Sequence, residues 1–291
     1  DEEAPEGAVA STDEDEEAFG GGTTGDEDYF VMLTNHGYIK KVPISQFAKI
    51  RKKGMVAIKL DSRPDKDGNP EKDQLGWVRR STGNSNIIIG STDGMVIRFH
   101  ESDVRPMGRS ARGVGAMRMN EGDSIVGFDA IELPAEPEVE EEEGSEGGES
   151  DALPTTPAAE TDAFMLFVTT DGYGKRTPVM RFRRQRRNGK GIIGIRFKNA
   201  QSKLACLCVV YPKSEVLIAT QGGIVVRQRI DGISIQGRMA TGVRLQQVGD
   251  DQVMAVTPVA EVPDLEGDAP GGGSTTPADP PAEPPSEPPK D

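Results

Sequence analysis

The chain has 291 residues, with 48 Asp and Glu against 34 Lys and Arg, and it contains two histidines and two cysteines. So few cysteines exclude a disulfide-rich scaffold. No run approaches the roughly 20 apolar residues that a membrane-spanning helix requires, so we expect no membrane span.

The net charge of −14 hides an uneven distribution along the chain. Residues 29–133 and 164–259 together hold 33 basic and 17 acidic side chains, whereas the rest holds 31 acidic residues and one basic residue. A basic body with acidic appendages indicates a polyanion partner, of which nucleic acid is the commonest.

The acidic segments 1–28, 134–163 and 260–291 lack the apolar content that a core needs, and we expect them to be disordered. Two interpretations of them stay open. They are solvated linkers and tails, or they compete with the polyanion for the basic body.

In chain order, four short apolar runs predict strands: YFVMLTN (29–35), NIIIGST (86–92), FMLFVTT (164–170) and VLIATQ (216–221). Each run leads into a turn in which Asn, Asp or Gln lies close to a glycine. These first glycines are Gly37, Gly94, Gly172 and Gly223. This pattern is typical of β-hairpins.

A cation follows each first glycine by four residues, and a second glycine follows it by 17 or 19 residues. The cations are Lys41, Arg98, Arg176 and Arg227, and the second glycines are Gly54, Gly113, Gly191 and Gly242. Five residues after each second glycine comes Lys59, Arg118, Arg196 or, in the last copy, Gln247. Because a position that recurs in every repeat lies on one rim of the assembled array, we expect all these cations to face outward along one track.

The second motif alternates, with apolar Ile58, Met117 and Ile195 directly before the cation and an apolar residue directly after it. One face should therefore pack and the other carry charge. Successive first glycines are 57, 78 and 51 residues apart; residues 134–163 lengthen the second gap and a loop at 62–73 lengthens the first. This spacing predicts an all-β, propeller-like array of about four blades, two in 29–133 and two in 164–259.

Positive charge is densest between Arg181 and Arg196. The cluster consists of Arg181, Arg183, Arg184, Arg186, Arg187 and Lys190, and two glycines, Gly189 and Gly191, allow a ligand to approach the backbone. We interpret this segment as a phosphate-binding loop. A solvated basic loop and a localisation signal are the alternatives.

Residues for catalysis are scarce. His36 and His100 are expected in turns or on the surface, and Cys206 and Cys208 lack the further ligands that a zinc site needs. We therefore expect a chain without catalytic residues, metal or cofactor of its own.

Several of these segments together resemble the C-terminal domain of the DNA gyrase A protein: KKGMVAIKL, DGMVIRFHESDVRPMGRSARGVGAMRM, GYGKRTPV and ISIQGRMATGVRL. The segment from Gln185 to Gly191, QRRNGKG, resembles that family's seven-residue box, with Asn188 where the family has glycine. The resemblance implies a six-bladed β-pinwheel that wraps duplex DNA around a basic rim and supports negative supercoiling driven by ATP. The homologous domain of topoisomerase IV is a close alternative, and a propeller that scaffolds other proteins is an alternative of another class.

The four repeats resemble the later blades of the six-bladed family, so we expect the first blades and the cleavage region upstream of Asp1. The family's box usually lies on the first blade, whereas the box-like segment here lies in the third repeat, so an ordinary basic loop of the rim is an alternative interpretation of it. The resemblance implies double-stranded DNA, the rest of the gyrase A protein and the gyrase B protein as partners, with ATP and magnesium bound only elsewhere in the holoenzyme. It implies a cytoplasmic, nucleoid-associated protein in a bacterium, or a plastid or mitochondrial one in a eukaryote. The candidate DNA contacts are Lys40, Lys41, Lys59, Arg98, Arg118, Lys175, Arg176, Arg181, Arg183, Arg184, Arg186, Arg187, Lys190, Arg196 and Arg227, and the box-like residues are Gln185, Arg186, Arg187, Asn188, Gly189, Lys190 and Gly191.

Overall fold

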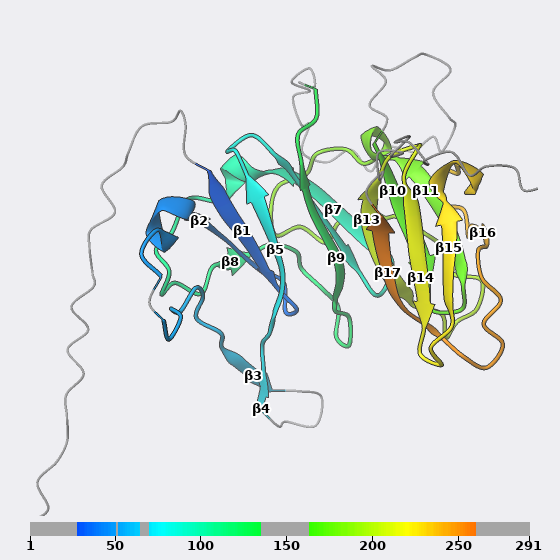
Figure 1. The fold of residues 1–291 in the computed structure, drawn as a ribbon, viewed down its shortest axis with the longest axis horizontal. Coiled ribbons are helices and arrows are strands. Elements are labelled where there is room, and N and C mark those ends of the chain that lie inside the picture. The colour runs from blue at the N-terminus through cyan, green and yellow to red at the C-terminus, as the bar shows by residue number, and fades with distance from the viewer. Residues whose placement is uncertain (1–27, 51, 65–69, 135–162, 260–291) are drawn as a thin grey trace, which may run out of the picture. The chain divides into compact units, whose positions relative to one another are not determined.

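The computed structural model describes residues 28–50, 52–64, 70–134 and 163–259 (Figure 1). The acidic segments predicted at 1–28, 134–163 and 260–291 lie almost entirely outside these residues. The described part contains strands and short 3-10 turns but no α-helix. It therefore has no helix that is long and apolar enough to cross a membrane.

Four sheets follow one another along the chain, and each contains one of the predicted hairpins. Their strand orders are β5-β1-β2-β8, β9-β6-β7-β12, β13-β10-β11-β16 and β17-β14-β15. We call these sheets the first to fourth blades. The all-β, propeller-like array of four blades is therefore confirmed.

The strands of the first two blades are β1 (Tyr29–Thr34), β2 (Tyr38–Pro43), β5 (Leu75–Ser81), β6 (Asn86–Ser91), β7 (Met95–His100), β8 (Val114–Gly115) and β9 (Ile125–Ile131). Those of the last two are β10 (Phe164–Thr169), β11 (Tyr173–Pro178), β12 (Ile192–Ile193), β13 (Leu204–Val210), β14 (Glu215–Thr220), β15 (Val225–Arg229), β16 (Val243–Arg244) and β17 (Val253–Val259). The 3-10 turns are η1 (Ile44–Phe47), η2 (Glu101–Asp103), η3 (Val179–Arg181) and η4 (Ile230–Gly232). The insertion expected at 62–73 forms a separate small hairpin of β3 (Ser62–Pro64) and β4 (Pro70–Lys72), which projects from the first blade in Figure 1.

Each of the first three blades obtains its fourth strand from the following repeat. The strand after Gly113, β8, pairs with β2; the strand after Gly191, β12, pairs with β7; and the strand after Gly242, β16, pairs with β11. The fourth blade has three strands among the described residues. The second glycine of a repeat therefore marks the point where the chain crosses to the preceding blade.

The first glycines occupy the hairpin turns that the sequence predicts. Gly37, Gly94, Gly172 and Gly223 have φ angles between 76° and 86°, a left-handed conformation that suits glycine because it has no Cβ. Each of these hairpins pairs in antiparallel register, as β1 does with β2 from Tyr29 opposite Pro43 to Leu33 opposite Ile39.

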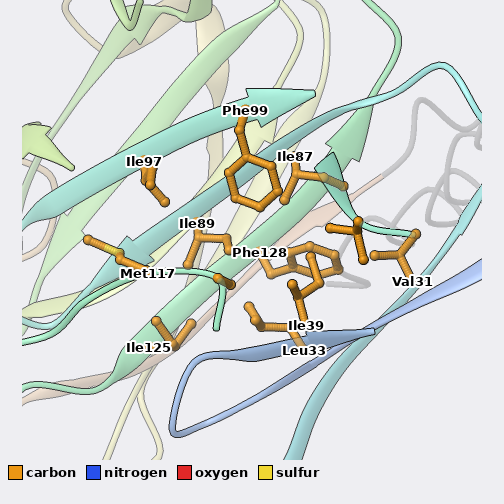
Figure 2. Close-up of a cluster of buried hydrophobic side chains, with 12 residues drawn as sticks. Val31, Leu33, Ile39, Ile87, Ile89, Ile97, Phe99, Met117, Ile125 and Phe128 are labelled. Atoms are coloured by element: carbon orange, nitrogen blue, oxygen red, sulfur yellow. The ribbon is translucent and has the colours of Figure 1, made fainter. Parts of the chain in front are cut away.

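Consecutive blades pack face to face, so the central strands are buried on both sides. In β6, Ile87 and Ile89 point into the core shared with the first blade, and Ile88 points into the core shared with the third. Figure 2 shows the first of these cores, in which Phe128 and Phe99 lie among the aliphatic side chains of both blades. Alternation along one strand thus serves two interfaces, which explains why these strands read as continuous apolar runs.

Candidate nucleic-acid interface

The cation four residues after the first glycine is buried in the first three blades. The exposed fraction is 5% for Lys41, 1% for Arg98 and 9% for Arg176. The prediction that these side chains face outward is therefore wrong, and they are not available for contact with a ligand on the surface.

Their partners explain the burial, because they are mainly carbonyl groups of the following repeat. Arg98 donates from Nη1 to the carbonyl of Phe182 (2.8 Å) and from Nε to Oδ1 of Asn86 (3.1 Å). Arg176 donates from Nε to the carbonyl of Ile233 (2.7 Å), and Lys41 donates to the carbonyl of Glu101 (3.3 Å). Desolvation by burial lowers the pKa of both Lys41 and Arg176. These cations hold neighbouring blades together.

Lys40 and Lys175, one residue earlier in their repeats, are also fully buried. The Lys40 ammonium donates to the carbonyls of Ala57 (2.8 Å), Ala111 (2.9 Å) and Arg109, and Lys175 donates to those of Gly237 and Arg238 (2.7 Å). Burial lowers the pKa of Lys40 to about 8, and the charge of Arg109 adds to this shift. Both lysines therefore stabilise the interior of the protein, contrary to the prediction that their side chains lie on the surface and contact DNA.

Arg227 is the equivalent residue of the fourth blade, and it is exposed. No following repeat covers it among the described residues. It forms an ion pair with Glu215, so part of its charge is already neutralised.

Three inter-blade loops, residues 104–113, 182–191 and 233–242, lead from a 3-10 turn to the second glycine of their repeats. In each loop one backbone N–H donates to the carbonyl of the buried cation in the preceding blade: Met107 to Lys41 (2.8 Å), Gln185 to Arg98 (2.7 Å) and Gln236 to Arg176 (2.9 Å). The box-like segment is therefore one of three loops with the same anchoring.

The second row of cations lies on the surface as predicted. Lys59, Arg118 and Arg196 are exposed, whereas the preceding Ile58, Met117 and Ile195 are buried. Their backbone N–H groups donate to the next inter-blade loop, at Ala111 (3.3 Å), Gly189 (2.9 Å) and Ala240 (3.4 Å) respectively. Each exposed cation is thus fixed at a junction between two repeats.

The arginine-rich loop combines anchored and exposed side chains. Arg183, Arg184, Arg186 and Lys190 are exposed, and Arg181 is half-buried. Arg187 donates to the carbonyls of Asp103 (3.1 Å) and Gly115, so it ties the loop to two segments of the second repeat. Rigid anchoring of the backbone restricts where the exposed cations of the loop can reach.

Asn188 has a φ of 66°, and it is the one non-glycine residue in the described chain with a positive φ. Asn is among the few residues that enter this region readily, which explains why it can stand where the resembled family has glycine. Its N–H donates to the carbonyl of Ala116 (2.8 Å).

We call Lys59, Arg118, Lys190 and Arg196 the junction row. Lys190 belongs to it because it adjoins Gly189, the residue that accepts from Arg118. None of the four belongs to an ion pair in the described part of the chain. Arg112 occupies the position of Lys190 in the first loop, but Asp61 lies 2.6 Å from it.

The sequence interpretation missed five cations near these junctions: Arg105, Arg109, Arg112, Lys198 and Arg244. Alignment of the three loops on their second glycine would have found Arg109 and Arg112, which correspond to Arg187 and Lys190. Arg238, the equivalent of Arg187 in the last loop, is buried. Within the described residues no group of three or more His, Cys, Asp or Glu side chains could hold a metal ion.

The family model described as "DNA gyrase C-terminal domain, beta-propeller" matches residues 28–66, 85–132, 163–204 and 214–260. The chain is 40% identical over 247 residues to the DNA gyrase A protein of Synechocystis sp., covering 82% of this chain and 27% of the relative. It is 35% identical over 237 residues to that of Staphylococcus epidermidis, covering 81% of this chain and 22% of the relative. The chain thus spans about a quarter of the length of these relatives.

Two solved structures share the fold. The C-terminal domain of DNA topoisomerase IV has a TM-score of 0.64 at 19% identity, covering 81% of this chain and 62% of that one. The DNA gyrase A C-terminal domain has a TM-score of 0.60 at 21% identity, covering 81% of this chain and 67% of that one. Since the family model matches one segment in each of the four blades, the chain belongs to the family of DNA gyrase C-terminal domains.

Proposed function

We propose that this chain binds duplex DNA through its phosphate backbone and bends it along the junction row. The observation that carries the proposal is the repetition of one arrangement at three junctions, each with an exposed cation whose backbone is fixed against the next loop. The exposed side chains of the arginine-rich loop, Arg183, Arg184 and Arg186, add positive charge beside the row.

Lys and Arg side chains that contact phosphates release condensed counterions, which produces binding that tolerates any sequence and weakens with salt. Bending roughly 20 to 30 base pairs costs a few kcal/mol, and this cost is offset when the bent duplex meets more cations. A row distributed over successive blades provides such contacts. The bend is the feature that would let the gyrase A protein wrap DNA and so favour negative supercoiling by an ATP-driven holoenzyme.

Gyrase is favoured over topoisomerase IV because the family model and the relatives at 35–40% identity are those of the gyrase A protein. The topoisomerase IV likeness, at 19% identity, concerns the fold. We propose that the chain supplies binding rather than cleavage, with the rest of the gyrase A protein and the gyrase B protein as partners, and ATP and magnesium bound in those parts. The site of action would be the nucleoid.

The test is the affinity of the chain for a long DNA duplex, measured by fluorescence anisotropy at several salt concentrations. Affinity should fall by orders of magnitude between roughly 50 and 200 mM salt and should be alike for unrelated sequences. A protein scaffold would show weak DNA binding with little salt dependence, and that result would overturn the proposal. Sealing a nicked plasmid with ligase in the presence of the chain tests wrapping, because DNA wrapped with one handedness keeps a change in linking number after the protein is removed.

A further inference from the structure

Tyr173 joins two positive charges at the edge of the third blade. It begins β11, directly opposite Arg244 of the donated strand β16. Nζ of Lys198 and Nη2 of Arg244 each lie 2.9 Å from the Tyr173 hydroxyl oxygen and donate to it. Lys198 Nζ and Arg244 Cζ also lie 4.7 Å and 5.5 Å from the centre of the ring.

No carboxylate balances this pair of charges within the described residues. Lys198 and Arg244 take part in none of the ion pairs found there. Asp171 accepts hydrogen bonds from Asn199 and Ser202 instead, and Asp93 pairs with Lys203. Like charges that converge on one atom repel each other, and an anion that lies beside them offsets this repulsion. The hydrogen bonds from Lys198 and Arg244 also lower the pKa of Tyr173.

The first blade contains a related site with a carboxylate, although Gly115 lies opposite Tyr38 where Arg244 lies opposite Tyr173. Tyr38 begins β2 as Tyr173 begins β11, and Arg112 lies over its ring at 4.5 Å from the centre. Asp61, seven residues after the second glycine Gly54, lies 2.6 Å from Arg112. Lys198 stands at the same distance in sequence from Gly191. The third blade therefore has a second cation where the first blade has an internal anion.

We propose that Tyr173, Lys198 and Arg244 form a phosphate-binding site whose ligand is a phosphodiester group of duplex DNA. The proposal rests on the DNA-binding function proposed above. Lys198 follows Arg196 of the junction row by two residues, and both side chains are exposed, so a duplex along the row reaches the site. The Tyr173 oxygen accepts two hydrogen bonds and keeps its own proton, which it can donate to a phosphate oxygen. The ammonium and guanidinium groups supply charge-assisted hydrogen bonds.

The first arm of the test is NMR of the chain with ¹³C-labelled tyrosine, in which Tyr173→Phe assigns one of the four tyrosine ring signals. A short DNA duplex should shift the Tyr173 signals at concentrations where inorganic phosphate does not. Equal shifts with inorganic phosphate would reassign the site to the free anion, and no shift with either would reject the site.

The second arm compares the salt dependence of DNA affinity. The Lys198→Ala/Arg244→Ala variant should lower the slope of log affinity against log salt by about one, the change expected for one lost phosphate contact. Arg112→Ala removes the cation over the Tyr38 ring and is the control; it should leave the slope unchanged because Asp61 already neutralises Arg112. An unchanged slope in the double variant, with wild-type DNA binding intact, would reject the site alone. If the wild-type chain itself does not bind DNA, the proposed function is rejected instead.

Discussion

At the scale of single residues, cations of the same type have two different roles, and their position in the repeat decides which. Arg98 is buried between blades and bonds a carbonyl of the next repeat, whereas Arg118 is exposed at a junction. A charge without carbonyl partners is costly inside a protein. Carbonyl acceptors accompany the buried cations after the first glycines, namely Lys40, Lys41, Arg98, Lys175 and Arg176. The exposed cations need no such partners because water solvates them.

Arg98→Ala and Arg118→Ala should therefore affect different properties, the first stability and the second DNA binding. The first leaves the Phe182 carbonyl and Asn86 without their donor and should lower the free energy of unfolding by roughly 2–5 kcal/mol. The second should change stability by less than about 0.5 kcal/mol while weakening DNA binding. Urea denaturation and anisotropy measure the two effects. A stable Arg98→Ala variant with weakened DNA binding would contradict the assignment.

Lys40 provides a dependence of stability on pH. Burial lowers its pKa from 10.5 to about 8, so between these values the unfolded chain binds the proton that the folded chain has lost. Stability from this group should therefore rise as pH increases through that window. The difference in unfolding free energy between the wild type and Lys40→Met isolates it from other groups. A difference that falls or stays constant from pH 8 to 10 would contradict the lowered pKa.

Asp61→Asn tests the neutralisation of Arg112. The substitution removes the carboxylate that lies 2.6 Å from the guanidinium, so Arg112 becomes available to a phosphate. DNA affinity at low salt should increase, and the salt slope should steepen by about one. An unchanged slope would mean that Arg112 lies away from the path of the duplex.

At the scale of elements, the inter-blade loops determine both packing and charge. Each loop crosses to the preceding blade, covers its buried cation and continues as that blade's fourth strand. The three backbones are anchored alike, but their charges differ. Loop 182–191 carries four exposed cations, whereas loop 104–113 carries two, of which Arg112 is paired with Asp61, and loop 233–242 carries one cation, the buried Arg238. DNA contacts should therefore be concentrated at the junction of the second and third blades.

Substitutions at Asn188 test the backbone conformation of the arginine-rich loop. Asn188→Gly should alter stability by no more than about 1 kcal/mol, because glycine adopts the observed φ of 66° freely. Asn188→Val should cost roughly 1–2 kcal/mol or shift the loop, since a β-branched residue is strained there. Thermal denaturation and DNA affinity together report both effects. Equal behaviour of the two variants would contradict a fixed left-handed conformation at this position.

Local sequence predicted the hairpins, their turn glycines and the alternation around Lys59, Arg118 and Arg196, because each depends on a few adjacent residues. It failed for Lys41, Arg98 and Arg176, whose burial is caused by the following repeat. Arg98 bonds Phe182, 84 residues away, and no local pattern reveals such a partner. The donated strands are only two residues long, too short for periodicity to distinguish them from a loop.

At the scale of the described part as a whole, three shared cores join four blades in series, so each blade contacts chiefly its neighbours. This arrangement brings the same position of successive repeats to successive junctions. It separates structural cations, between blades, from the exposed junction row. Sequence composition alone cannot make this distinction, because a buried cation and an exposed one each add one positive charge to residues 29–133 and 164–259.

The central claim is that the junction row binds DNA phosphates. Its most direct test compares the Arg118→Ala/Lys190→Ala/Arg196→Ala variant with a control, Arg80→Ala/Arg227→Ala/Arg229→Ala, whose three arginines are exposed but form ion pairs with carboxylates. Both variants lose three positive charges. The junction variant should lower the slope of log DNA affinity against log salt by about three, and the control should lower it much less. Equal losses in the two variants would show that net charge, rather than the junction row, governs binding.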